Sequence, residues 1–95
     1  MITTMHDWSL VSISMDWVSA RVTIALKDDT SSTRALIAEG VRSLSVPREN
    51  NWGPSASINT FLIETLSAGR QRLQIEMQSG DAIEIVAERF DIPNH

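Results

Sequence analysis

The chain has 95 residues, of which 42% are hydrophobic and 21% charged, and it contains no cysteine. This predicts one globular domain over 1–95 and excludes disulfides, thiolate chemistry and thiolate metal sites. A net charge of −4, with arginines scattered among acids, argues against nucleic acid and against an anionic membrane surface as partners. No apolar run approaches a membrane span and the N-terminus does not resemble a secretory signal, so we expect a cytoplasmic protein.

The first predicted strand has an apolar residue at every second position: Val11, Ile13, Met15 and Trp17. This alternation is typical of a half-buried strand and places Trp17 in the core. Trp8 and Leu10 have the opposite parity, which predicts a bulge near Leu10-Val11.

The segment 21–27 alternates in the same way, with Val22, Ile24 and Leu26 facing inward. A four-residue type I loop over 18–21 would join the two strands and pair Trp17 with Val22 and Met15 with Ile24. A slip by one residue would turn every apolar side chain outward, so the hydrophobic pattern restricts the register.

A polar turn is predicted at 27–32, followed by two short strand-forming pieces at 33–38 and 41–46. Glu39-Gly40 separates these pieces. Gly40 is compatible with a bulge in one bent strand or with a tight turn between two strands, and the sequence leaves both open.

The stretch 47–57 contains two prolines, a glycine and two asparagines, which predict an irregular loop with a binding or packing role. In 58–66, β-branched residues favour a strand, while the spacing of Ile58, Phe61 and Leu62 also fits a short helix over 59–67.

The last predicted hairpin has two alternating apolar sets: Leu73, Ile75 and Met77, and Ile83, Ile85 and Ala87. A three-residue loop over 78–80, with Gly80 in the left-handed conformation, places Ile75 opposite Ile83 and Leu73 opposite Ile85. Phe90 and Ile92 then either extend the second strand or cap the core.

About six or seven short strands with regular turn signals predict an all-β fold, a small antiparallel sandwich or a partly open barrel. The alternative is an α+β fold with one short helix near 59–67.

Candidates for acid–base chemistry are His6-Asp7 and the pair Glu76 and Glu84. Adjacent strand residues point to opposite faces, and an alternating acidic face is the ordinary solvent side of a sheet, so we expect a non-catalytic protein. Asp28-Asp29 lacks the further oxygen ligands of a calcium loop, and we expect neither a metal nor a cofactor.

The best site candidate in the sequence is Trp52, in the 47–57 loop, with Arg48 and Asn51 beside it and Trp8 as a further contributor. An exposed tryptophan stacks well on a sugar or a partner side chain. The competing interpretation makes Trp52 a plug that pins the loop over one end of the sandwich.

Two stretches, Trp-Gly-Pro-Ser from Trp52 and Ile-Glu-Met-Gln-Ser-Gly-Asp from Ile75, together with His6-Asp7 and the Gly40-Val41 step, resemble a family of small uncharacterised bacterial proteins of about this length. The resemblance covers nearly the whole chain. It implies a bacterial cytoplasmic β-domain and supplies no catalytic residues.

The sequence therefore favours a protein-interaction or regulatory module acting through a sheet edge or the 47–57 loop, with homodimerisation as one possibility. The alternative is a domain that binds a small ligand, such as a sugar, through the Trp52 loop. An acid–base enzyme is a distant third hypothesis.

Overall fold

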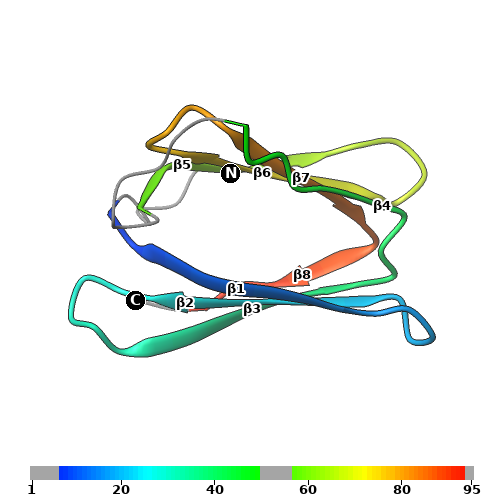
Figure 1. The fold of residues 1–95 in the computed structure, drawn as a ribbon. Coiled ribbons are helices and arrows are strands. Elements are labelled where there is room, and N and C mark those ends of the chain that lie inside the picture. The colour runs from blue at the N-terminus through cyan, green and yellow to red at the C-terminus, as the bar shows by residue number, and fades with distance from the viewer. Residues whose placement is uncertain (1–6, 50–56, 94–95) are drawn as a thin grey trace.

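The computed structural model describes residues 7–49 and 57–93, and within these it contains eight strands and no helix. The first sheet has the order β1-β2-β3-β8, and the second has the order β4-β7-β6-β5. All neighbouring strands are antiparallel, and the two sheets stack as two layers (Figure 1). The predicted antiparallel sandwich is confirmed, with more strands than expected because two are only three residues long. The strands are β1 (Ser9–Asp16), β2 (Arg21–Lys27), β3 (Thr33–Glu39), β4 (Ser43–Ser45), β5 (Ile58–Thr65), β6 (Gln71–Met77), β7 (Ala82–Ala87) and β8 (Arg89–Asp91).

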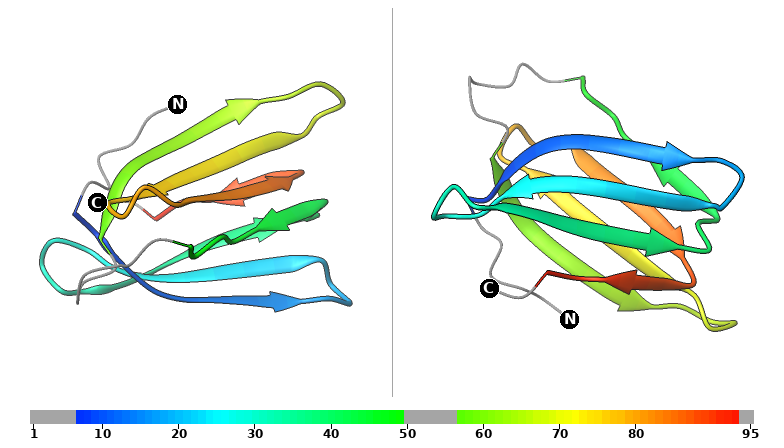
Figure 2. Two further views of the ribbon diagram at one scale, coloured as in Figure 1. Left: turned by 45° about the horizontal axis from the view of Figure 1, so that its top comes forward. Right: turned by 90° about the horizontal axis from the view of Figure 1, so that it is seen from below.

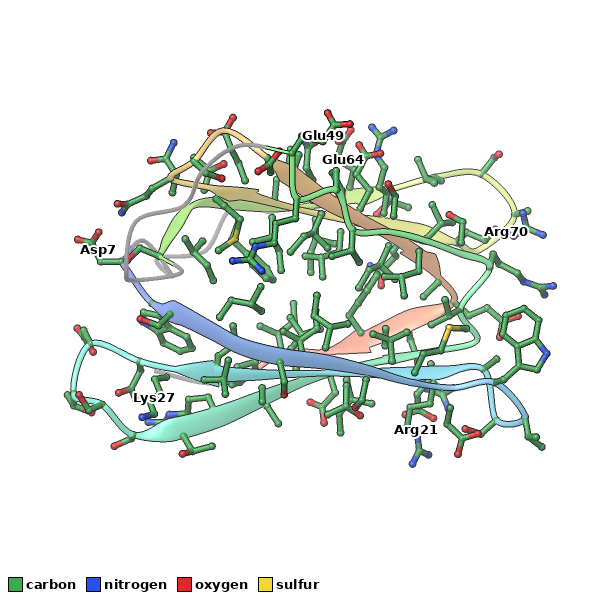
Figure 3. All side chains as sticks on the ribbon, viewed as in Figure 1. Asp7, Arg21, Lys27, Glu49, Glu64 and Arg70 are labelled. Carbon is green, nitrogen blue, oxygen red and sulfur yellow. The ribbon has the colours of Figure 1, made fainter. Side chains whose placement is uncertain are left out.

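The hydrophobic core lies between the two sheets, where side chains from both layers fill the space (Figure 3). The first sheet supplies alternate residues of β2 and β3, and the second supplies alternate residues of β5, β6 and β7. The largest fully buried side chains are Trp8, Ile24, Leu26, Leu36, Ile58, Phe61, Leu73, Ile75, Met77, Ile83 and Ile85. Period-two alternation therefore builds this core.

The β6–β7 hairpin confirms its predicted register, with Ile75 opposite Ile83 and Leu73 opposite Ile85. Gly80 has a φ of 99°, and its amide donates to the Met77 carbonyl at 2.9 Å. The glycine therefore stands where the turn requires a positive φ.

The β1–β2 hairpin differs from the predicted register by two residues, because Met15 lies opposite Val22 and Asp16 opposite Arg21. The turn occupies 17–20, one residue earlier than predicted. The turn begins early because of Asp16, whose Oδ1 accepts hydrogen bonds from the amides of Val18 at 3.1 Å and Ser19 at 3.3 Å. An aspartate that bonds the amides two and three residues onward initiates a turn.

Because the turn starts early, Trp17 leaves the strand and its exposed fraction is 83%. The prediction that Trp17 lies in the core is wrong. A slip of two residues preserves which face each residue occupies, so Val22 and Ile24 are still buried. The predicted bulge is confirmed by the register shift between Leu10 and Ser12.

The predicted polar turn between β2 and β3 is organised by Asp28, which is buried. Its carboxylate accepts hydrogen bonds from the Thr30 hydroxyl at 2.6 Å and the Ser32 amide at 2.9 Å, and from Arg34 Nε at 2.9 Å. The Thr30 bond and the Arg34 guanidinium hold the pKa of Asp28 well below its usual range.

Gly40 forms neither a bulge nor a hairpin turn, because β3 and β4 belong to different sheets. Its φ is 66°, and a Cβ atom there would lie 2.7 Å from the Glu88 carboxylate. The Glu88 amide donates to the carbonyls of Glu39 and Gly40 at 3.1 and 3.2 Å. The chain crosses between the sheets a second time at Glu88, so the two crossings lie side by side.

The second crossing leads into β8, which pairs with β3 and places Phe90 opposite Ala38. Phe90 and Ile92 therefore do not extend β7; both pack against the core. The segment predicted over 58–66 forms the strand β5 (Ile58–Thr65), and the alternative of a short helix is wrong. β5 pairs with β6 at the edge of the second sheet and places Phe61 opposite Ile75.

Candidate functional site

Of the residues proposed from sequence for a binding site, the structure describes Trp8 and Arg48. Trp8 has an exposed fraction of 1%, and its carbonyl accepts a 2.8 Å hydrogen bond from the Ile58 amide, so its indole is part of the core. Arg48 is exposed. Asn51 and Trp52 lie outside the described residues, and the choice between a plug and a ligand contact at Trp52 stays a prediction.

The acid–base candidates are separated or occupied by ordinary sheet contacts. Asp7 accepts a 2.7 Å hydrogen bond from the Gln78 amide group, while His6 lies outside the described residues. Glu76 lies opposite Ala82 and Glu84 opposite Gln74, the predicted diagonal arrangement. The Asn59 amide group donates to Glu76 at 2.8 Å.

The Asp28 carboxylate, one of the oxygen ligands considered for calcium, is already bonded within its own turn. Over 7–49 and 57–93, no three His, Asp or Glu side chains gather closely enough to hold a metal ion.

The clearest surface feature is a group of apolar side chains on the β1–β2 hairpin. Among the described residues, five large hydrophobic side chains are exposed, and four of them belong to this hairpin. Their exposed fractions are 56% for Val11, 39% for Met15, 83% for Trp17 and 96% for Val18. Since large apolar side chains scattered singly are normal on surfaces, their gathering on one hairpin is the informative observation.

β1 is also an edge strand: it pairs with β2 on one side, and on the other side only its first residue, Ser9, forms an isolated bridge, with Ser57 (Figure 2). An edge strand leaves alternate backbone amides and carbonyls unpaired, and proteins usually protect such edges with charge, proline or shortness. β1 is eight residues long and carries no charge and no proline before Asp16. Its bulge at Val11 is the one protective device in it.

The other three edges are better protected. β4 and β8 are three residues long, and β8 carries Arg89 and Asp91. β5 is as long as β1, but its Glu64 carboxylate binds Arg72 at 2.9 Å, and none of its large hydrophobic side chains is exposed. Of the two long edge strands, only β1 therefore carries exposed large apolar side chains.

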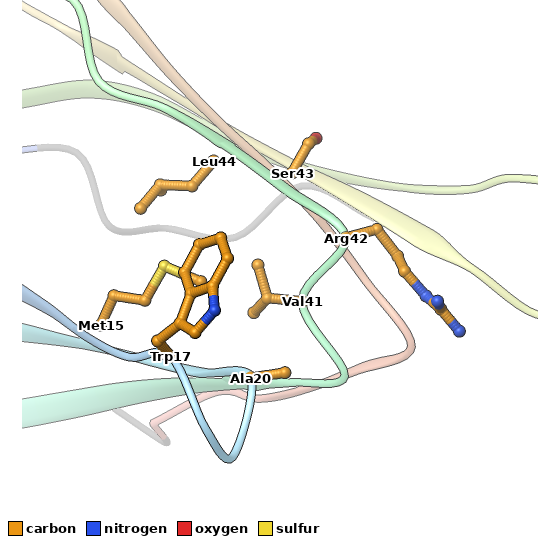
Figure 4. A pocket seen from close by; sticks show the side chains of 7 residues that line it. All are labelled: Met15, Trp17, Ala20, Val41, Arg42, Ser43 and Leu44. Atoms are coloured by element: carbon orange, nitrogen blue, oxygen red, sulfur yellow. The ribbon is translucent and has the colours of Figure 1, made fainter.

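A pocket of about 470 Å³ opens beside the tip of the β1–β2 hairpin (Figure 4). One wall comes from the hairpin and the other from the crossing into β4; the lining residues are Met15, Trp17, Ala20, Val41, Arg42, Ser43 and Leu44. The Val41 amide donates to the Ala20 carbonyl at 2.9 Å and fixes the two walls relative to each other.

The interior of this pocket is mainly apolar. The Trp17 indole lies beside Met15 and faces Val41 and Leu44, whereas the Arg42 guanidinium points away from them (Figure 4). Arg42 instead binds the Glu88 carboxylate at 2.9 Å. β4, which supplies Ser43 and Leu44 to the lining, is only three residues long.

Sequence reasoning did not find this site. The signal that could have revealed it is Asp16 followed by two large apolar residues, Trp17 and Val18, because a turn-initiating aspartate places the next residues at a hairpin tip. Alternation alone assigned Trp17 to the strand.

Comparison of the chain with protein families, with curated proteins and with solved structures finds no match in any of the three. The resemblance to small bacterial proteins therefore stays a prediction. In the part of the chain that the structure describes, no helix has the length and apolar character to cross a bilayer.

Proposed function

We propose that this protein is a non-catalytic interaction module that binds a protein partner along the free edge of β1. The observation that supports the proposal is the gathering of four exposed apolar side chains on a long edge strand and the turn that follows it, with Asp16 as the one charged residue of the strand. Of the two surfaces predicted from sequence, a sheet edge and the 47–57 loop, we favour the edge.

The mode of binding would be strand addition. An extended segment of the partner would pair with the unpaired amides and carbonyls of β1, and these main-chain hydrogen bonds would supply affinity for any suitable strand. Val11, the extra residue of the bulge, and Met15, on the inner face, would contact partner side chains on opposite faces of the sheet, and Trp17 at the hairpin tip would supply the large apolar area typical of a binding hot spot. Specificity would therefore come from the apolar pattern of the partner strand.

A selection from displayed random peptides tests this proposal and does not require an identified partner. We expect the selected peptides to be extended and alternately apolar, and to slow hydrogen exchange of the β1 amides when bound. Val11→Lys introduces a charge at the edge that strand addition must desolvate, and it should weaken peptide binding about tenfold or more.

The matched control is Thr65→Lys, which places the same charge on an exposed position of the other long edge strand, β5. It should leave peptide binding unchanged. Selected peptides that bind equally well to Val11→Lys, or that protect β5 amides and leave β1 amides exchanging freely, would refute the proposal.

The pocket beside Trp17 supports a second candidate function, the binding of a small apolar ligand. Its volume of about 470 Å³ lies within the range typical of ligand sites. The fluorescent apolar dye anilinonaphthalene sulfonate is a suitable probe. Its fluorescence should rise with the folded protein, fall with Trp17→Ala and stay unchanged with Val46→Ala, an exposed apolar residue that does not line the pocket. An equal response of all three proteins would dismiss the pocket as a site.

We further propose the bacterial cytoplasm as the location of the protein. The support is chemical: a chain of this size that uses no cysteine does not depend on an oxidising compartment for its fold. Detection of the protein in the soluble cytoplasmic fraction of bacterial cells is the expected result, and its recovery from the periplasm or the medium would contradict the proposal.

A further inference from the structure

The sulfur chemistry of this chain is confined to methionine, because it contains four methionines and no cysteine. The structure describes two of the four, Met15 and Met77, whereas Met1 and Met5 lie outside the described residues. Met77 has an exposed fraction of 1% and belongs to the core, whereas the exposed fraction of Met15 is 39%. Of these two side chains, only Met15 is accessible to a water-soluble oxidant in the folded protein.

Met15 lies where the core ends and the pocket beside Trp17 begins. It is on the inner face of β1, opposite Val22 and two residues beyond Ile13, which packs against the core. Its side chain lines the pocket, and there it lies beside the Trp17 indole (Figure 4). A polarisable thioether is a favourable neighbour for an aromatic ring. Met15 therefore contributes apolar surface to the pocket while it stays in contact with solvent.

We infer that Met15 is an oxidation-sensitive switch of this pocket, which a hydroperoxide sets by converting the thioether to a sulfoxide that binds apolar ligands more weakly. The switch rests on the second candidate function, the binding of a small apolar ligand in the pocket. In the oxidation step, a lone pair of the Met15 sulfur attacks one oxygen of hydrogen peroxide. The sulfur–oxygen bond forms as the oxygen–oxygen bond breaks, and the second oxygen leaves as water. Sulfur thereby loses two electrons, and the peroxide gains them.

The consequence for binding follows from the side chains around Met15. A thioether is a weak hydrogen-bond acceptor, whereas a sulfoxide makes the side chain polar. Val41 and Leu44, which face the Trp17 indole, have no side-chain donor, and the Arg42 guanidinium points away from them and binds Glu88 (Figure 4). An apolar ligand would therefore remove the sulfoxide oxygen from water without replacing its hydrogen bonds, which is unfavourable.

The fold should tolerate this oxidation. Without a ligand, the sulfoxide of a partly exposed residue keeps its hydrogen bonds to water. Met77 differs, because it lies in the core opposite the buried Ile58 and reacts only when the protein opens. Methionine sulfoxide is also reduced back to the thioether by methionine sulfoxide reductases, one enzyme for each epimer. Oxidation at Met15 is therefore reversible and separate from oxidative unfolding.

Peptide mass mapping after treatment of the full chain with hydrogen peroxide measures the oxidation rate of each methionine. We expect Met15 to be oxidised about tenfold or more faster than Met77, because the side chain of Met77 must first be uncovered. The circular dichroism spectrum should be unchanged at the point where Met15 is fully oxidised. Equal rates for the two methionines in a protein that stays folded would overturn the inference.

Titration with anilinonaphthalene sulfonate before and after peroxide treatment measures the effect on the pocket. The dye affinity of the wild type should fall about tenfold or more. Met15→Leu keeps the other three methionines and should show no further loss on treatment. Met77→Leu is the matched control, a volume-conserving change that removes a sulfur from the core, and it should lose affinity as the wild type does. Each protein is compared with itself, so differences in untreated affinity do not enter.

The outcomes separate the switch from the candidate function on which it rests. The switch is overturned if the wild type keeps its dye affinity once Met15 is oxidised, or if Met15→Leu loses affinity as the wild type does. Incubation with both reductases and dithiothreitol should restore the affinity of the oxidised wild type, and a permanent loss would show damage in place of a switch. An untreated protein that does not bind the dye refutes both the ligand pocket and its switch.

Discussion

The first strands of the β6–β7 and β1–β2 hairpins have the same alternating pattern, but their apolar side chains differ in burial. In β6, Leu73 and Ile75 are completely buried, whereas Val11 and Met15 of β1 are 56% and 39% exposed. β6 has a neighbour on each side within its sheet, but β1 has a neighbour on one side only. Alternation decides which side chains share a face, and the position of the strand in the sandwich decides whether that face is covered.

The turns of the two hairpins also differ, in the type of residue that adopts a positive φ. Gly80 takes a positive φ in the β6–β7 turn without steric cost, whereas Ala20 takes a φ of 54° in the β1–β2 turn, where a Cβ atom is disfavoured. The β6–β7 turn therefore has no steric cost at Gly80, whereas the β1–β2 turn has backbone strain at Ala20, beside an exposed apolar surface. Substitutions at five positions test this contrast and the turns of the first sheet.

The largest expected effect is the loss of core packing. Ile75→Ala should lower the free energy of unfolding by about 2–5 kcal/mol, because a fully buried side chain leaves a cavity. Met15→Ala removes a side chain that is already partly in water and should cost less than about 1 kcal/mol. Urea denaturation of both variants measures the difference. Similar losses would show that β1 is covered as well as β6 is.

Asp28→Asn should rank second, because it removes the charge that holds together the β2–β3 turn. The folded pKa of Asp28 lies below its ordinary value of 3.8, mainly because of Thr30 and Arg34. Its contribution to stability is therefore present above pH 3.8 and is lost as the pH falls through the folded pKa.

The free-energy difference between the wild type and Asp28→Asn should accordingly be constant near neutral pH and shrink in acid. Thermal melts from neutral pH to strongly acidic pH measure this dependence. Asp29→Asn, at the exposed neighbouring position, is the control. A difference that stays constant into acid would contradict the role of the Asp28 carboxylate.

Gly80→Ala should lower the free energy of unfolding by about 1–2 kcal/mol, because an L side chain is disfavoured at positive φ. The effect is local to the turn, so chemical denaturation should show a lower midpoint with an unchanged slope. An unaltered midpoint would mean that the turn rearranges at little cost.

Ala20→Gly should have the smallest effect and the opposite sign. Relief of the left-handed strain at φ 54° outweighs the greater entropy of glycine in the unfolded chain, and the net gain should be about 0.5 kcal/mol. The same denaturation experiment measures it. A loss of stability would indicate that the Ala20 side chain matters to the pocket wall more than its backbone strain does.

Most of the fold could be predicted, because the alternation of the buried strands shows which side chains face the core and, together with the turn residues, which residues pair. Ile75 faces Ile83 as expected, since Gly80 determines the loop length between them. The crossing at Gly40 could not be predicted, because a positive φ is shared by turns, bulges and connections between sheets. Only the packing of Glu88 against Gly40 distinguishes them.

The candidate site was largely missed for a related reason. Trp17 continues the alternation of Met15, and the side-chain bonds of Asp16 that end the strand depend on geometry that a periodic pattern does not contain. Trp8 is named from sequence only as a further contributor to the Trp52 site, because a tryptophan near the start of a strand has no pattern that places it. The chain at Trp8 instead lies against the start of β5, where Ile58 donates to its carbonyl.

The order β1-β2-β3-β8 also has a consequence for how the chain is made. Residues 33–39 leave the ribosome long before residues 89–91, so β3 has an open outer edge until the last strand is synthesised. A product that ends before residue 89 would present the seven residues of β3 as an edge in place of the three residues of β8. Such a fragment would expose more unpaired backbone than the full sheet does, which favours its recognition by chaperones.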